Sequence, residues 1–201
     1  MTFLDEKIAQ LERASRQQKR EEAAQKLEAA KESQTVKKLT LDEVRSQIKQ
    51  DTLELDGIKL EFERKKYFEE KLPLRLAKNF FDEVTTDEKA IVFTSNRHCI
   101  CEMFTYVDEN LPIKTIEEYK VEMEENFKKI PAYIGIQKAI ALEKLDYLSY
   151  RTPSKKGWIY NIILFVHKNE RRIMGNLNCL ETNEVGCLLL EALVLEMNEN
   201  M

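Results

Sequence analysis

The periodicity of hydrophobic and polar positions changes near residue 50 of this 201-residue chain. Residues 1–50 contain neither Gly nor Pro and are dominated by Ala, Glu, Gln, Lys and Arg, which favour helices. Leu4, Ile8 and Leu11 begin an apolar stripe that gives way to polar residues from Ser15 onward, so no coiled-coil heptad is sustained. We therefore expect residues 1–50 to form a charged helical extension. This extended charged helix is either a solvated helix or tail, or it binds a partner or a second copy of itself.

A second helix start lies inside this extension. Thr40 is followed three residues later by Glu43, which is the spacing of a capping box. Leu41, Val44 and Ile48 then share one helical face. This short helix is expected either to dock on the body of the protein or to lead into it.

From residue 51 the apolar residues alternate with a period of two, which predicts strands. Asp56 and Gly57 separate two short apolar runs, and this dipeptide favours a two-residue hairpin turn. Residues 71–90, which include Pro73, are expected to form a connecting segment. Further strands are expected at 90–96, 99–107, 133–145, 146–152, 158–168 and 171–181, and helices at 115–131 and 184–199.

Short hairpins between many strands, with two main helices, predict an α+β domain with an antiparallel sheet over residues 51–201. The strand at 158–168 carries apolar residues in both alternating sets, so both of its faces are expected to be covered. The predicted architecture is therefore an α/β/α sandwich, an antiparallel sheet covered by helices on both faces.

Four segments carry a resemblance to a known superfamily. They are LPLRLAKNFFDEV, VFTSN, IEEYKVEMEENFKKI and IYNIILFVHKNERRIMGNLNCLETNEVGCLLLEALV. Their order resembles the PsbP-like α/β/α sandwich superfamily over residues 53–198, a group that includes PsbP, the Ran-release factor Mog, DcrB and the Eag chaperones of type VI secretion. The resemblance implies a domain without catalytic residues that binds proteins or assists their assembly. Eag chaperones shield apolar helices of secreted effectors. An acidic, cytoplasmic protein fits that role better than it fits binding to a photosystem.

The strands at 158–168 and 171–181 define a candidate site. An even-length turn at Asn169-Glu170 would pair Phe165 with Met174, Ile163 with Asn176 and Asn161 with Asn178. The three Asn would then share one face with an apolar floor. They either bond to each other, to water or to a helix end, or they line a groove that holds a partner peptide or helix.

The last predicted helix is apolar almost all round. Val185, Leu188, Leu189, Ala192 and Leu195 can lie on the sheet. Leu190 and Val194 then remain, to be covered by the N-terminal helix or to contact a client or a second copy of the chain. The candidate partner-binding residues are thus Asn161, Ile163, Phe165, Met174, Asn176, Asn178, Leu190 and Val194.

Composition argues against several functions. A formal net charge of −4 offers no basic field for nucleic acid, and no apolar run reaches the ~20 residues of a membrane span. The stretch MTFLDEKIAQ lacks the features of a secretory signal, so we expect a cytoplasmic protein with its four Cys reduced. The resemblance to the Eag chaperones implies that the protein is bacterial.

Candidate chemistry is sparse. On a strand, Cys99 and Cys101 would face the same way and serve as core packing rather than metal ligands. Cys179 falls on the apolar strand face without a base, so packing is expected rather than reactivity. His98 and His167 have no nucleophile motif or glycine-rich loop near them, and we expect no enzyme activity, no cofactor and no metal.

The expected function is that of a protein-binding module. It would be an adaptor or chaperone of the secretion-associated type, shielding an apolar helix of a partner or effector. The alternative is an immunity-like or assembly protein that binds one folded partner, and a homodimer is a further outcome.

Overall fold

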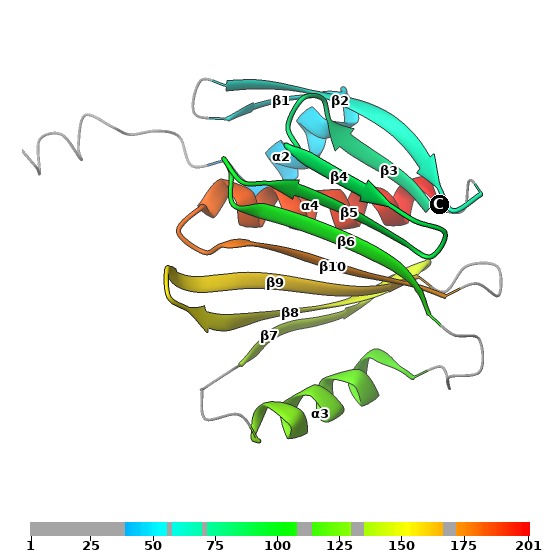
Figure 1. The fold of residues 1–201 in the computed structure, drawn as a ribbon, viewed down its shortest axis with the longest axis vertical. Coiled ribbons are helices and arrows are strands. Elements are labelled where there is room, and N and C mark those ends of the chain that lie inside the picture. The colour runs from blue at the N-terminus through cyan, green and yellow to red at the C-terminus, as the bar shows by residue number, and fades with distance from the viewer. Residues whose placement is uncertain (1–38, 56–57, 70–71, 108–113, 130–134, 167–171) are drawn as a thin grey trace, which may run out of the picture. The chain divides into compact units, whose positions relative to one another are not determined.

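The computed structural model describes residues 39–55, 58–69, 72–107, 114–129, 135–166 and 172–201 (Figure 1). They belong to one unit that begins at Leu39. The extended charged helix expected in the first part of the chain lies outside the described residues.

The larger sheet has seven antiparallel strands in the order β4-β5-β6-β10-β9-β8-β7. The strands are β4 (Glu83–Thr86), β5 (Ala90–Ser95), β6 (Ile100–Val107), β7 (Ile136–Ala141), β8 (Leu145–Ser154), β9 (Gly157–Val166) and β10 (Arg172–Leu180). The described residues therefore form an α+β fold with an antiparallel sheet, as the pattern predicts.

A second antiparallel sheet contains β1 (Thr52–Leu55), β2 (Ile58–Tyr67) and β3 (Leu72–Ala77). Leu55 pairs with Ile58, as a two-residue hairpin requires, although the turn itself lies outside the described residues. The expectation of a connecting segment at 71–90 is wrong, because β3 and β4 both lie within it. Pro73 is tolerated there because β3 is an edge strand, where a missing backbone N–H breaks no ladder.

Three helices are present among the described residues: α2 (Leu41–Lys49), α3 (Ile116–Phe127) and α4 (Glu184–Asn200). Both predicted capping boxes form, one at Thr40 for α2 and one at Thr115 for α3. Asn183 caps α4, and its side-chain oxygen accepts the backbone N–H of Gly186 at 2.8 Å. Local sequence thus sets all three helix starts.

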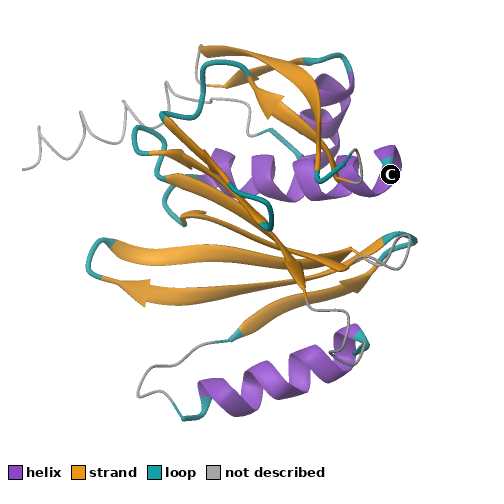
Figure 2. Cartoon of the chain, turned by 45° about the vertical axis from the view of Figure 1, so that its right-hand side comes forward, coloured by secondary structure: helices purple, strands orange, loops and turns teal. Residues whose placement is uncertain are grey.

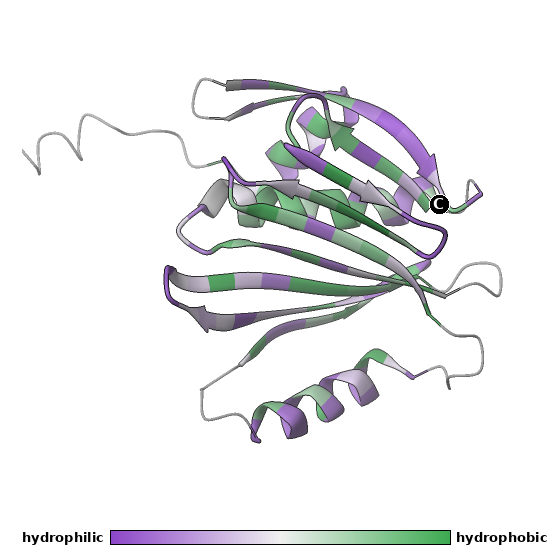
Figure 3. Ribbon diagram, in the orientation of Figure 1, coloured by the Kyte–Doolittle hydropathy of each residue, from purple (hydrophilic) through white to green (hydrophobic). Residues whose placement is uncertain are grey.

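The core lies where α4 packs against β3, β9 and β10, with α2 alongside α4 (Figures 1 and 2). Figure 3 shows α4 as mainly hydrophobic, whereas α3 carries many hydrophilic residues. Val44 and Ile48 of α2 have no exposed surface and join the core. Residues 41–49 are therefore an integral part of the folded unit.

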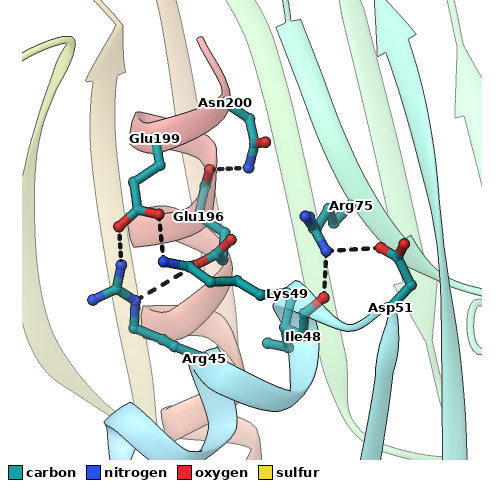
Figure 4. Close-up of polar contacts among 8 residues, drawn as sticks. All are labelled: Arg45, Ile48, Lys49, Asp51, Arg75, Glu196, Glu199 and Asn200. Atoms are coloured by element: carbon teal, nitrogen blue, oxygen red, sulfur yellow. Dashed lines mark hydrogen bonds and ion pairs between the residues drawn. The ribbon is translucent and has the colours of Figure 1, made fainter.

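Helix α4 is oriented differently from the expectation. Leu190 and Val194 have no exposed surface, so they belong to the core and are not available to a client. Glu196 and Glu199 point toward α2 instead (Figure 4). Leu190 lies about 180° around the helix from Glu199, because each residue advances the helix by about 100°.

Helix α3 contacts the sheet through two aromatic pairs. Tyr119 stacks on Phe165 of β9, and Phe127 lies beside Tyr150 of β8. Three positions earlier on β8, the Tyr147 hydroxyl donates instead to Glu191 of α4, at 3.0 Å. Because strand residues an odd number of positions apart point to opposite faces, the side chains of Tyr150 and Tyr147 lie on opposite sides of β8.

Candidate partner-binding surface

The predicted pairing of β9 with β10 is confirmed. Phe165 pairs with Met174, Ile163 with Asn176, and Asn161 with Asn178. The turn that was expected to set this register lies outside the described residues. The three Asn therefore do lie on one face of the sheet, opposite the face that carries Leu164 and Leu177 in the core.

Strands β5 and β6 extend this face, and we call the whole surface the half-open face. Its residues are Ala90, Val92, Thr94, Cys101, Met103, Thr105, Ile163, Met174, Asn176 and Asn178, all of them half-buried. The core-facing residues between them on β5 and β6 are buried, for example Phe93 and Phe104. An antiparallel sheet with one packed face and one partly open face explains this alternation.

Strand register arranges the half-open face in rows. Val92 pairs with Met103, Met103 with Asn176, and Asn176 with Ile163, which makes one continuous row across four strands. The Cβ atoms of directly paired residues lie about 5 Å apart, so their side chains contact each other. The centre of the row is therefore apolar except for the amide of Asn176.

Asn161 is satisfied within the sheet. Its side-chain nitrogen donates to Thr152 Oγ1 at 3.1 Å and to the backbone oxygen of Ile159 at 3.0 Å. The residue is only 7% exposed. Asn161 therefore stabilises the β8–β9 edge of the face and offers little to a partner.

Phe165 is covered by α3. Its ring stacks on Tyr119 with centroids 3.9 Å apart and an interplanar angle of 10°. The predicted apolar floor is thus divided: Phe165 packs under α3, while Ile163 and Met174 remain half-buried beside it. Helix α3 borders the half-open face at this end.

Asn176 has an unmet hydrogen-bonding group. Its Oδ1 atom is buried and has no hydrogen-bond partner among the described residues. Such an atom costs about 1–3 kcal/mol when it is left unsatisfied. Because this atom has almost no solvent-accessible surface, a donor from a bound partner would recover that free energy only after the Asn176 amide turns outward.

Several residues of the face were missed from the sequence. Val92, Met103 and Thr105 carry the same alternating pattern as β9 and β10, but no short turn joins β6 to β10. Since the register of a non-local strand pair is not set by a turn, the position of these residues beside Asn176 could not be derived.

The structure places two of the residues that were considered as chemical candidates, Cys99 and His98. Cys99 lies in the turn before β6 with a positive φ of 51°, so it does not share a strand face with Cys101, which corrects the expectation. The ring of His98 stacks on Phe80 with centroids 4.4 Å apart. The described residues contain no group of three or more His, Cys, Asp or Glu placed to hold a metal ion.

A buried carboxyl lies on the core face of β6. Glu102 is only 3% exposed and its strand neighbours are Phe93 and Leu177. Burial raises the pKa of the Glu102 carboxyl from 4.5 to about 8. The group is therefore largely protonated near neutral pH.

Ion pairs and hydrogen bonds of charged residues join α2 to α4 and to β3 (Figure 4). Lys49 Nζ lies 2.7 Å from Glu199 and 3.7 Å from the buried Glu196. Arg45 pairs with both glutamates. Arg75 Nη1 donates to Asp51 at 2.7 Å and to the backbone oxygen of Ile48 near the end of α2.

A cavity of about 160 Å³ lies next to this cluster. It is lined by Arg64, Lys65, Lys66, Pro73, Leu74, Arg75, Glu196, Met197 and Asn200. The buried groups on its wall, Arg75 and Glu196, already hold α2, so we assign this region a structural role.

None of the helices in the described part of the chain is both long and apolar enough to cross a membrane.

No protein-family model matches this sequence, and no curated protein matches it. Among solved structures, the Ran-binding protein Mog1p of Saccharomyces cerevisiae is similar, with a TM-score of 0.50 and 8% sequence identity, over 69% of this chain and 93% of that one. A mutant form of Mog1 gives 0.49 and 8%, over 68% and 92%. PA94 of Pseudomonas aeruginosa, a protein of unknown function, gives 0.38 and 12%, over 61% and 85%. The likeness to Mog1p is one of fold.

Proposed function

We propose that this chain is a non-enzymatic protein-binding module of the PsbP-like α/β/α sandwich superfamily. The half-open face supports this proposal more than any other feature. It is wide, partly apolar and bordered by α3, and it contains an unsatisfied amide oxygen at Asn176. Its apolar row offers a surface for another protein.

The similarity in fold to Mog1p is consistent with this proposal, since that protein is described as a binder of Ran. With 8% identity the partner does not carry over. The proposal takes from that protein only the type of function, recognition of another protein, and does so by analogy of fold.

The proposed mechanism is shielding of an apolar partner segment, as in a cytoplasmic, bacterial, secretion-associated chaperone or adaptor. Val92, Met103, Ile163 and Met174 would bury an apolar helix of the partner or effector. Each 100 Å² of apolar surface removed from water contributes about 2.5 kcal/mol. Asn176, with Asn178 one row away, would pair polar groups of that segment.

A charge placed in the apolar row tests the site. Met174→Glu and Met103→Glu should weaken partner capture from the native cell extract and then weaken binding of the purified partner at least about tenfold. Val121→Glu is the matched control, because Val121 is 55% exposed on α3. Thermal unfolding of all three variants confirms that each is folded.

The opposite result is equally informative. If Val121→Glu abolishes binding while both methionine variants bind normally, the partner uses the outer side of α3 and the half-open face is not the site.

Salt distinguishes the two classes of partner. Apolar shielding should persist in high salt and extend to an isolated helical peptide. An immunity-like or assembly protein would need the folded partner and would lose affinity as salt screens the charges at the rim. Sedimentation of the purified chain tests for a homodimer.

The N-terminal extension is proposed to add a second contact. Its role should be tested by removing residues 1–38 and not 1–50, because α2 contributes Val44 and Ile48 to the core. Retained binding assigns recognition to the body of the protein, and lost binding assigns it to the extension.

A further inference from the structure

Two cysteines from different elements meet at one corner of the core. Cys179 lies near the end of β10 and Cys187 lies in the first turns of α4. Their sulfur atoms are 3.6 Å apart. The chain reverses direction between them, and Asn183 fixes the reversal by capping α4.

The two thiols differ in access to solvent. Cys179 is 1% exposed, because its side chain points to the core face together with Leu177. Cys187 is half-buried, so a reagent can reach it. Any reaction with a molecule in solution would therefore begin at Cys187.

The two thiols also differ in acidity. The hydrogen bond between the two thiols lowers the pKa of the Cys187 thiol. The same contact, together with burial, raises the pKa of Cys179. The first turns of a helix further favour a thiolate, because the helix dipole places positive charge there.

Charged neighbours act on Cys187 in opposite directions. Glu181 raises the pKa of Cys187, and Arg151 lowers it. These two side chains form an ion pair with each other, so their effects partly cancel. The contact with Cys179 remains the largest influence.

We propose that Cys179 and Cys187 form a reversible thiol–disulfide site that reacts with low-molecular-weight disulfides. Cys187 is the attacking thiol and Cys179 is the resolving thiol. This site is independent of the half-open face and goes beyond protein binding.

The reaction takes place in two exchanges. The Cys187 thiolate attacks one sulfur of the small disulfide, which forms a mixed disulfide and releases the first small thiolate. Cys179 then gives up its proton to solvent and attacks the Cys187 sulfur, which releases the second small thiolate. The two protein thiols are oxidised by two electrons in total, and the small disulfide is reduced to two thiols.

The expected disulfide joins the end of β10 to the start of α4. The sulfur atoms must approach from 3.6 Å to a bond length of about 2 Å, which requires only small side-chain and backbone shifts. The new link closes a short loop and should stabilise the fold modestly.

Oxidised glutathione is the probe, applied to the full chain with Cys99→Ser and Cys101→Ser. Only the two cysteines of the site then remain. We expect both free thiols to disappear and the intact mass to fall by two hydrogen atoms. A cross-linked peptide should contain Cys179 and Cys187. The midpoint of thermal unfolding should rise by a few degrees and return when dithiothreitol is added.

Single variants assign the roles. With Cys179→Ser added, the reaction should stop at a stable mixed disulfide on Cys187. With Cys187→Ser added, Cys179 should react at least about tenfold more slowly in the folded chain. Intact mass separates the internal disulfide from the mixed one without any activity assay.

Three outcomes would overturn the proposal. The first is a mixed disulfide that persists although both cysteines are present. The second is equal reactivity of the two single variants. The third is a folded chain that does not react under conditions where the same chain in urea does.

Discussion

The carboxyl of Glu102 gives the protein a predictable dependence on pH. Its pKa is raised from 4.5 to about 8 by burial on the core face of β6. Between these pH values the folded state binds one proton more than the unfolded state. Rising pH therefore favours unfolding, and the stability present below pH 4.5 is lost as pH rises through 8.

The size of the effect follows from the same values. At about 1.4 kcal/mol per pKa unit, the full window from 4.5 to 8 corresponds to about 5 kcal/mol. At pH 7 the loss relative to pH 4.5 is about 3 kcal/mol. Glu102→Gln replaces the buried acid by a neutral group of similar shape, so the variant should escape this loss.

Urea unfolding of wild type and Glu102→Gln between pH 4.5 and 8.5 measures the effect. The two proteins should have similar stability at pH 4.5. The variant should be more stable by up to about 3 kcal/mol at pH 7. Glu83→Gln is the control, because Glu83 is exposed on β4. A stability difference between wild type and Glu102→Gln that does not change with pH would refute the reasoning.

Three further changes test the fold by urea unfolding at one pH. Gly175→Ala should destabilise by about 1–3 kcal/mol, because its new Cβ would lie 2.8 Å from Leu164 Cγ in the core; unchanged stability would contradict that close approach. Thr115→Ala removes the capping oxygen of α3 and should cost about 1 kcal/mol, whereas Thr115→Ser should cost less. Tyr119→Ala should destabilise the fold and increase binding of a hydrophobic dye by uncovering Phe165, an effect that Tyr119→Phe should not reproduce.

The sequence predicted what depends on neighbours in the chain. Capping boxes placed the starts of α2 and α3, and the pairing of Asn161 with Asn178 followed from an even-length turn. These features require only local geometry. The expected α+β class followed from the order of such elements.

Long-range packing could not be predicted in the same way. The rotation of α4 depends on where its carboxylates meet α2, so the burial of Leu190 and Val194 was not visible in an almost uniformly apolar helix. Met103 was missed because β6 pairs with a distant strand. Cys187 was missed because its contact with Cys179 needs the reversal at the start of α4.

The contact between α2 and α4 has a consequence for how fast the protein folds. Arg45 and Glu199 are 154 residues apart, and both helices supply core residues. Contacts between such distant parts of a chain form late, because loop closure must come before any gain from the contact. Folding of this unit should therefore be slow compared with helical bundles. Its final step should be the docking of α2, while the hairpin of β9 and β10 can form early.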